Sequence, residues 1–187
     1  MKKVGLEHVL ERRFQPGLVF IIDDPTDSDH NQIYMCRESQ RTGITIDDIT
    51  FNGYHKPWFV YAADVPDNTK IKALVKIEPT THYDVILAHL RKHQQYLVEA
   101  AKLELEIHFD LKHKDDTSAL DRPAAPLSKY GLYFKDKVSG LKVDYCIFSG
   151  HKILVRGVDT SEITFTSLHE AKDYVNKHLE QFKPPAN

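Results

Sequence analysis

Residues 83–102 read YDVILAHLRKHQQYLVEAAK, and residues 103–112 after them read LELEIHFDLK. In the first stretch apolar residues recur every three to four positions, which predicts an amphipathic helix from a cap at Thr80 or Thr81 to about Ala101. In the second stretch apolar and polar residues alternate, which is typical of a strand with one buried face. A helix that passes directly into a strand indicates an α+β protein.

The N-terminal half is rich in short runs of β-branched and aromatic residues, separated by turn-forming pairs such as Asn52-Gly53. This pattern predicts a small antiparallel sheet or barrel. The expected strands cover residues 18–22, 33–36, 44–51, 58–62 and 71–77.

The C-terminal part begins with a connection at residues 113–128 that contains two prolines and has no periodicity. Tight turns then separate four further runs, which predicts an antiparallel meander. Ser167 and Glu170 have the S-x-x-E spacing of a capping box, so we expect a helix to close the meander. The expected strands cover residues 130–135, 141–148, 152–158 and 163–166.

Two subdomains are expected from this layout: a β-rich part at residues 1–78, and a part at residues 79–187 with the order helix, strand, loop, meander, helix. A chain of 187 residues also allows both parts to form one continuous domain.

Composition limits the location and the class of partner. The N-terminus lacks the apolar segment of a secretory signal, and no apolar run approaches the ~20 residues that span a bilayer. We therefore expect a cytoplasmic protein without a membrane partner. The net charge is −2, so nucleic-acid binding would need a local basic patch. Cys36 and Cys146 are too few and too far apart for a disulfide framework.

His89 and His93 are the best candidate metal ligands. Imidazoles four residues apart on a helix can bind one zinc ion. The residues between them are Leu90, Arg91 and Lys92, so the glutamate of the HExxH protease motif is missing. The alternative interpretation places both rings at the edge of the core. No cofactor is predicted beyond an optional divalent metal, whose further ligands would come from the polar face of the strand: Glu104, Glu106, His108 and Asp110.

Asp110-Leu111-Lys112 has a D-x-K spacing that resembles the second half of the PD-(D/E)xK nuclease motif. That resemblance implies carboxylates that hold Mg²⁺ and a lysine that positions water. The acidic turn from Asp23 to Asp29 also has the carboxylate density of a cation site, although Asx turns at a solvated tip explain it more simply.

Two segments favour a protein partner. Aromatic and cationic residues meet in one turn, and interfaces are rich in such residues. The loop at residues 113–128 is long for a simple connection, and its apolar and charged residues would anchor and orient a partner. The residues in question are Tyr54, His55, Lys56 and Trp58 in the turn, and Asp115, Asp116, Leu120 and Arg122 in the loop.

Basic residues interleave with aromatic residues along the predicted meander, as they do on sheets that bind single-stranded nucleic acid. The candidate nucleic-acid contacts are Lys129, Tyr133, Lys135, Lys152 and Arg156.

Phosphate-binding glycine loops and the G-x-S-x-G nucleophile motif are both missing from the sequence. The leading hypothesis is therefore a non-enzymatic binding or regulatory protein, an adaptor or inhibitor, that acts on a macromolecular partner. The alternatives are a metal-dependent hydrolase of nucleic acid or nucleotides, and a nucleic-acid-binding module.

Overall fold

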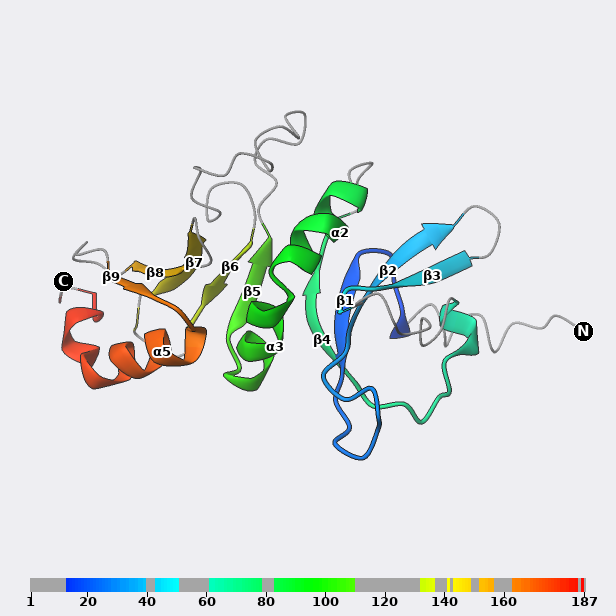
Figure 1. Cartoon of the computed structure of the whole chain (residues 1–187), viewed down its shortest axis with the longest axis horizontal. Coiled ribbons are helices and arrows are strands. Elements are labelled where there is room, and N and C mark those ends of the chain that lie inside the picture. Colours follow the sequence, from blue (N-terminus) through cyan, green and yellow to red (C-terminus); the bar gives the residue numbers. More distant parts are fainter. Residues whose placement is uncertain are drawn as a thin grey trace, which may run out of the picture. The chain divides into compact units, whose positions relative to one another are not determined.

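The computed structural model describes residues 13–39, 43–50, 61–78, 83–109, 132–136, 141, 143–148, 152–156, 163–184 and 186. Its contacts divide the chain into two compact units, Met1–Gln94 and Gln95–Asn187. Each unit contains one antiparallel sheet and helical segments, which confirms the predicted α+β class (Figure 1). Within the described residues, no helix is long and apolar enough to cross a membrane.

The first unit contains a four-stranded sheet with β1 and β2 in its middle and β3 and β4 at its ends (Figure 1). The prediction of a strand at residues 58–62 is wrong for its described part, because Ala62–Asp64 forms the 3-10 helix η1 and Tyr61 makes a single bridge to Thr45. The strands are β1 (Leu18–Ile22), β2 (Ile33–Ser39), β3 (Gly43–Asp48) and β4 (Ile71–Lys76).

Both faces of this sheet are covered. Aromatic and aliphatic side chains fill a core on one face, centred on Phe20 and Tyr34, whose rings stack at 5.6 Å. The opposite face carries Met35 and Arg37, and the Arg37 guanidinium bonds to Asp84 on helix α2 at 2.9 Å. Because side chains alternate along a strand, α2 must lie over this second face.

The predicted single helix is wrong at one residue, because α2 (Tyr83–Lys92) and α3 (Gln94–Lys102) are separated at His93. The His93 amide donates to the carbonyl of Leu90, three residues earlier in the chain. In a regular α-helix an amide donates to the carbonyl four residues earlier. The predicted caps at residues 80 and 81 lie outside the described residues.

The second unit contains the predicted meander. Each of its five strands pairs antiparallel with the next in chain order. The predicted strand at 103–112 begins later than expected, because Leu103 and Glu104 form a turn in which Glu104 has a left-handed φ of 56°. The strands are β5 (Glu106–Phe109), β6 (Leu132–Lys135), β7 (Asp144–Phe148), β8 (Lys152–Arg156) and β9 (Ile163–Phe165).

Helix α5 (Leu168–Lys177) closes the meander, as predicted. The Ser167 hydroxyl accepts from the Glu170 amide at 3.1 Å, which confirms the cap. The Glu170 carboxylate accepts instead from the Thr166 hydroxyl, at 2.9 Å. A second carboxylate, that of Glu99 on α3, accepts from the first two amides of α5 at 2.8 and 3.1 Å.

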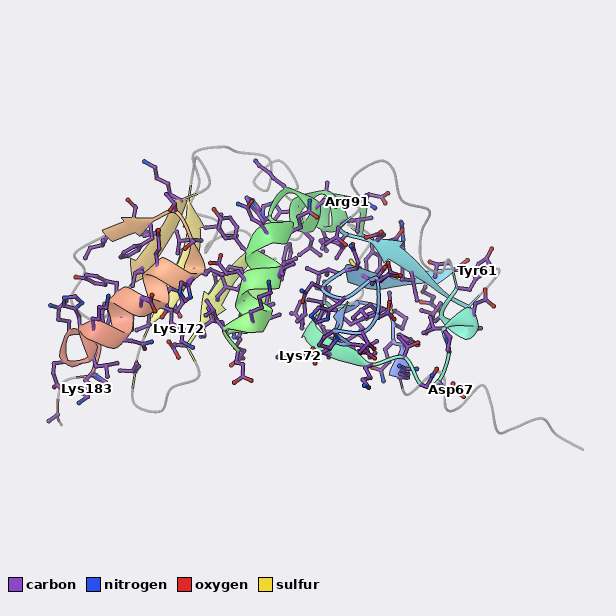
Figure 2. All side chains as sticks on the ribbon, turned by 60° about the horizontal axis from the view of Figure 1, so that its bottom comes forward. Tyr61, Asp67, Lys72, Arg91, Lys172 and Lys183 are labelled. Atoms are coloured by element: carbon purple, nitrogen blue, oxygen red, sulfur yellow. The ribbon has the colours of Figure 1, made fainter. Side chains whose placement is uncertain are left out.

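The same two helices are also linked in the opposite direction. Lys172 on α5, labelled in Figure 2, donates to the Leu103 carbonyl at 2.9 Å, just beyond the end of α3. Each helix therefore supplies a charged group to the terminus of the other, and each charge has the sign that the helix dipole favours.

Candidate functional site

The two faces of the second sheet differ in what covers them. The ring of Phe165 on β9 lies 5.4 Å from the ring of Tyr174, which places α5 on the Phe165 face. Strand register puts one continuous row of side chains on the opposite face, one from each of the five strands. From β5 to β9 the row is His108, Tyr133, Cys146, Leu154 and Thr164.

Access to this face is not uniform. Cys146 and Leu154, in the middle of the row, are buried. Glu106 and Thr164 are exposed, and His108 and Tyr133 are partly exposed. The surface available to a partner therefore lies mainly over β5 and β6. We call Glu106, His108, Tyr133 and Lys135 the β5–β6 rim.

Side chains of the rim contact one another. The rings of His108 and Tyr133 stack at 5.2 Å with 18° between their planes. The Lys135 ammonium lies over the Tyr133 ring, 5.8 Å from its centroid. The Glu106 carboxylate lies 2.8 Å from His108 Nε2. These contacts hold an aromatic platform between an acidic and a basic group.

A second row on the same face carries charges of alternating sign. Glu106 pairs in register with Lys135, Lys135 with Asp144, and Asp144 with Arg156. Neighbouring strands lie about 4.8 Å apart, so Lys135 has an acidic residue on each side within one strand spacing. The basic residues of this face can be found from the sequence, but Asp144 cannot, because strand register alone makes it a neighbour of Lys135.

The predicted nucleic-acid contacts are thus only partly placed. Tyr133 and Lys135 lie on the rim, and Lys152 is exposed on the same face as Leu154. Arg156 pairs in register with Asp144, and its side chain is not described. Lys129 lies outside the described residues.

The connection between β5 and β6 is much longer than their pairing requires. Phe109, the last residue of β5, pairs in register with Leu132, the first residue of β6. Hairpins that join such partners usually have loops of about two to five residues. Here the chain passes through residues 110–131 before it returns.

The partner-binding residues predicted from sequence lie outside the described residues, both those at positions 54–58 and those at positions 115–122.

The predicted metal ligands fall in different places. His89 and His93 belong to the first unit, while Glu106 and His108 lie on the rim in the second. Glu104 is in the turn before β5 rather than on its polar face, and Asp110 lies outside the described set. Among the side chains that the structure describes, no three His, Cys, Asp or Glu gather as a metal site. The metal site stays a prediction.

The acidic turn before β2 is built from Asx turns. The Asp24 carboxylate accepts from the Thr26 amide at 3.0 Å and from its hydroxyl at 2.7 Å, and Asp27 accepts from the Asp29 amide at 2.9 Å. The Thr26 hydrogen bonds lower the pKa of Asp24, and the Lys70 ammonium 3.5 Å away acts in the same direction.

Comparison with protein-family models, with curated proteins and with solved structures found no match to this chain.

Proposed function

We propose that this chain is a non-enzymatic binding or regulatory protein of the cytoplasm, and that it acts on a protein partner. The partner would contact the β5–β6 rim together with residues of the adjoining connection, among them Asp115, Asp116, Leu120 and Arg122. Tyr54, His55, Lys56 and Trp58, which the sequence predicts as interface residues, would provide a second contact.

The observation that carries this proposal is the length of the connection between two strands that pair directly. Phe109 and Leu132 are already neighbours, so residues 110–131 are not needed to close the sheet. Residues 110–131 can therefore serve another purpose, such as contact with a partner. The rim beside its two ends carries the aromatic and mixed-charge groups that protein interfaces favour.

The charge pattern favours a protein over a nucleic acid. A phosphate that contacts Lys135 would also lie within about one strand spacing of Glu106 and Asp144. At that separation the repulsion from two acids offsets the attraction to one cation. A protein surface can present its own alternating charges, so complementarity is available to it and not to a polyanion.

Photo-crosslinking in the native cell, followed by affinity measurement, tests the proposal. A photo-reactive residue replaces Glu106, the exposed residue of the rim, and a control replaces Asn176, which is exposed on α5. The expected result is a protein adduct from position 106 that survives nuclease treatment and is missing from position 176.

Binding of the identified partner is then measured with purified proteins. We expect Tyr133→Ala, and replacement of residues 115–126 by a short Gly/Ser linker, each to weaken binding by about 2 kcal/mol or roughly 30-fold. Lys177→Ala, at an exposed position of α5, is the matched control and should leave the affinity unchanged. Undiminished affinity in both folded variants would show that the rim is not the binding surface.

A further inference from the structure

Two histidines at the end of helix α2 have rings that pack against each other: His89 lies within the helix, and His93 directly follows its last residue, Lys92. His89 is 8% exposed and His93 is 3% exposed. Their ring centroids are 5.1 Å apart, with the planes inclined at 72°. His89 Nε2 and both ring nitrogens of His93 are shielded from solvent. Histidine is not commonly buried in this way, so the pair calls for a chemical explanation.

The ring separation matches that of two imidazoles bound to one tetrahedral ion. Zinc binds imidazole nitrogen at about 2.0–2.1 Å, with an angle near 109° between ligands. The centre of an imidazole ring lies about 1.15 Å behind the bound nitrogen, so two rings on one ion have centroids about 5.1–5.3 Å apart. The 5.1 Å between the ring centroids of His89 and His93 falls in that range.

We propose that His89 and His93 together bind one divalent transition-metal ion of the class Zn²⁺, Ni²⁺ or Cu²⁺. Imidazole suits these ions, whereas Mg²⁺ and Ca²⁺ prefer oxygen ligands. Within the described part of the chain no third His, Cys, Asp or Glu joins the pair. Water or an external ligand would have to enter this shielded site to fill the remaining positions, and the two neutral rings leave the charge of the ion uncompensated, so modest affinity follows.

Metal binding should also stiffen the junction that follows α2. His93 is the residue at which α2 stops, and its amide bonds to the Leu90 carbonyl at 3.2 Å. An ion held by residues on both sides of this last turn ties the turn to the body of the helix.

The test is calorimetric titration of the full chain with ZnCl₂ near neutral pH, after chelator treatment and removal of the chelator. We expect one saturable site in the wild-type chain. His89→Ala and His93→Ala should each lower the zinc affinity by about tenfold or more, because the loss of a mere hydrogen-bond partner of a metal ligand already costs about 10–100-fold. His169→Ala is the matched control, since His169 is a helical histidine that is well exposed and has Asp173 four residues away.

Two further readouts separate metal binding from a packing role. Zinc should slow amide exchange at residues 89–94 in the wild-type chain, and MgCl₂ should not. Affinity should fall as pH drops, because imidazole must be neutral to bind. A folded wild-type chain that shows no saturable zinc site overturns the proposal, and so does a site that persists unchanged in the variants of both histidines.

Discussion

Gly17 and Gly43 provide a matched pair of substitutions that differ in one physical quantity. Both have a left-handed backbone, with φ of +85° and +81°. A Cβ at position 17 would lie 1.9 Å from the carbonyl oxygen of Ile77, whereas a Cβ at position 43 would have nothing within 4 Å. Replacing each by alanine therefore isolates the steric clash from the backbone preference.

The expected magnitudes follow from these distances. For both variants an alanine in the left-handed region costs about 1–2 kcal/mol. At position 17 the obstacle is backbone, so the chain must move, and overpacking of this kind adds about 1–3 kcal/mol. Movement also strains two backbone hydrogen bonds of Gly17, its amide to Cys36 and its carbonyl to the Ile77 amide, both 2.8 Å long. We expect Gly17→Ala to lose about 2–5 kcal/mol and Gly43→Ala about 1–2 kcal/mol.

Urea unfolding followed by circular dichroism measures the two free energies, and hydrogen exchange resolved to peptides of β1 and β4 assigns the loss to the first unit. In Gly17→Ala the amides of these two strands should lose protection first, because residue 17 joins the start of β1 to Ile77 at the end of β4. Equal losses for the two variants would refute the reasoning, since the clash would then contribute nothing.

Two other predictions concern charge and burial. Glu99→Ala should lower the free energy of unfolding by about 1–3 kcal/mol, because it removes the carboxylate that accepts from the amides of Leu168 and His169. Glu180→Ala, which removes an exposed ion pair with Lys183, should cost less than about 1 kcal/mol, and urea unfolding of both variants compares the two losses. Burial raises the pKa of the Cys36 thiol to about 12, so the folded state keeps its proton where an unfolded chain loses it. The stabilisation from Cys36 is complete below the ordinary thiol pKa of 9.0 and is lost as pH rises toward 12. The free energy of unfolding of Cys36→Ala should therefore fall less steeply with alkaline pH than that of the wild type. Iodoacetamide should label the wild-type thiol far more slowly in the folded chain than in urea.

Local sequence patterns were sufficient for the class of most described elements, although not for the predicted strand at residues 58–62, and they did not fix the exact limits. Alternation and turn residues predicted β1 and the C-terminal meander, and the spacing of Ser167 and Glu170 predicted the cap of α5. These features depend on residues within a few positions of one another, so periodicity and capping chemistry report them directly. The helix break at His93 was missed, since apolar residues continue with helical spacing through it.

Burial of the histidine pair could also be anticipated from the sequence. His89 and His93 share the helical arc of Ile86 and Leu90, and all four side chains are buried. A helical period places residues on a common face whatever lies opposite, so the prediction needed no knowledge of the sheet.

Contacts between distant segments were decided only by the tertiary structure. Strand register made Asp144 a neighbour of Lys135 and turned an apparently basic face into one of alternating charge. The pairing of Phe109 with Leu132 showed that residues 110–131 connect two neighbouring strands. Glu99 caps a helix that begins about seventy positions later in the chain. Periodicity specifies which face a side chain occupies but not which strand lies beside it, because register depends on packing of the whole sheet.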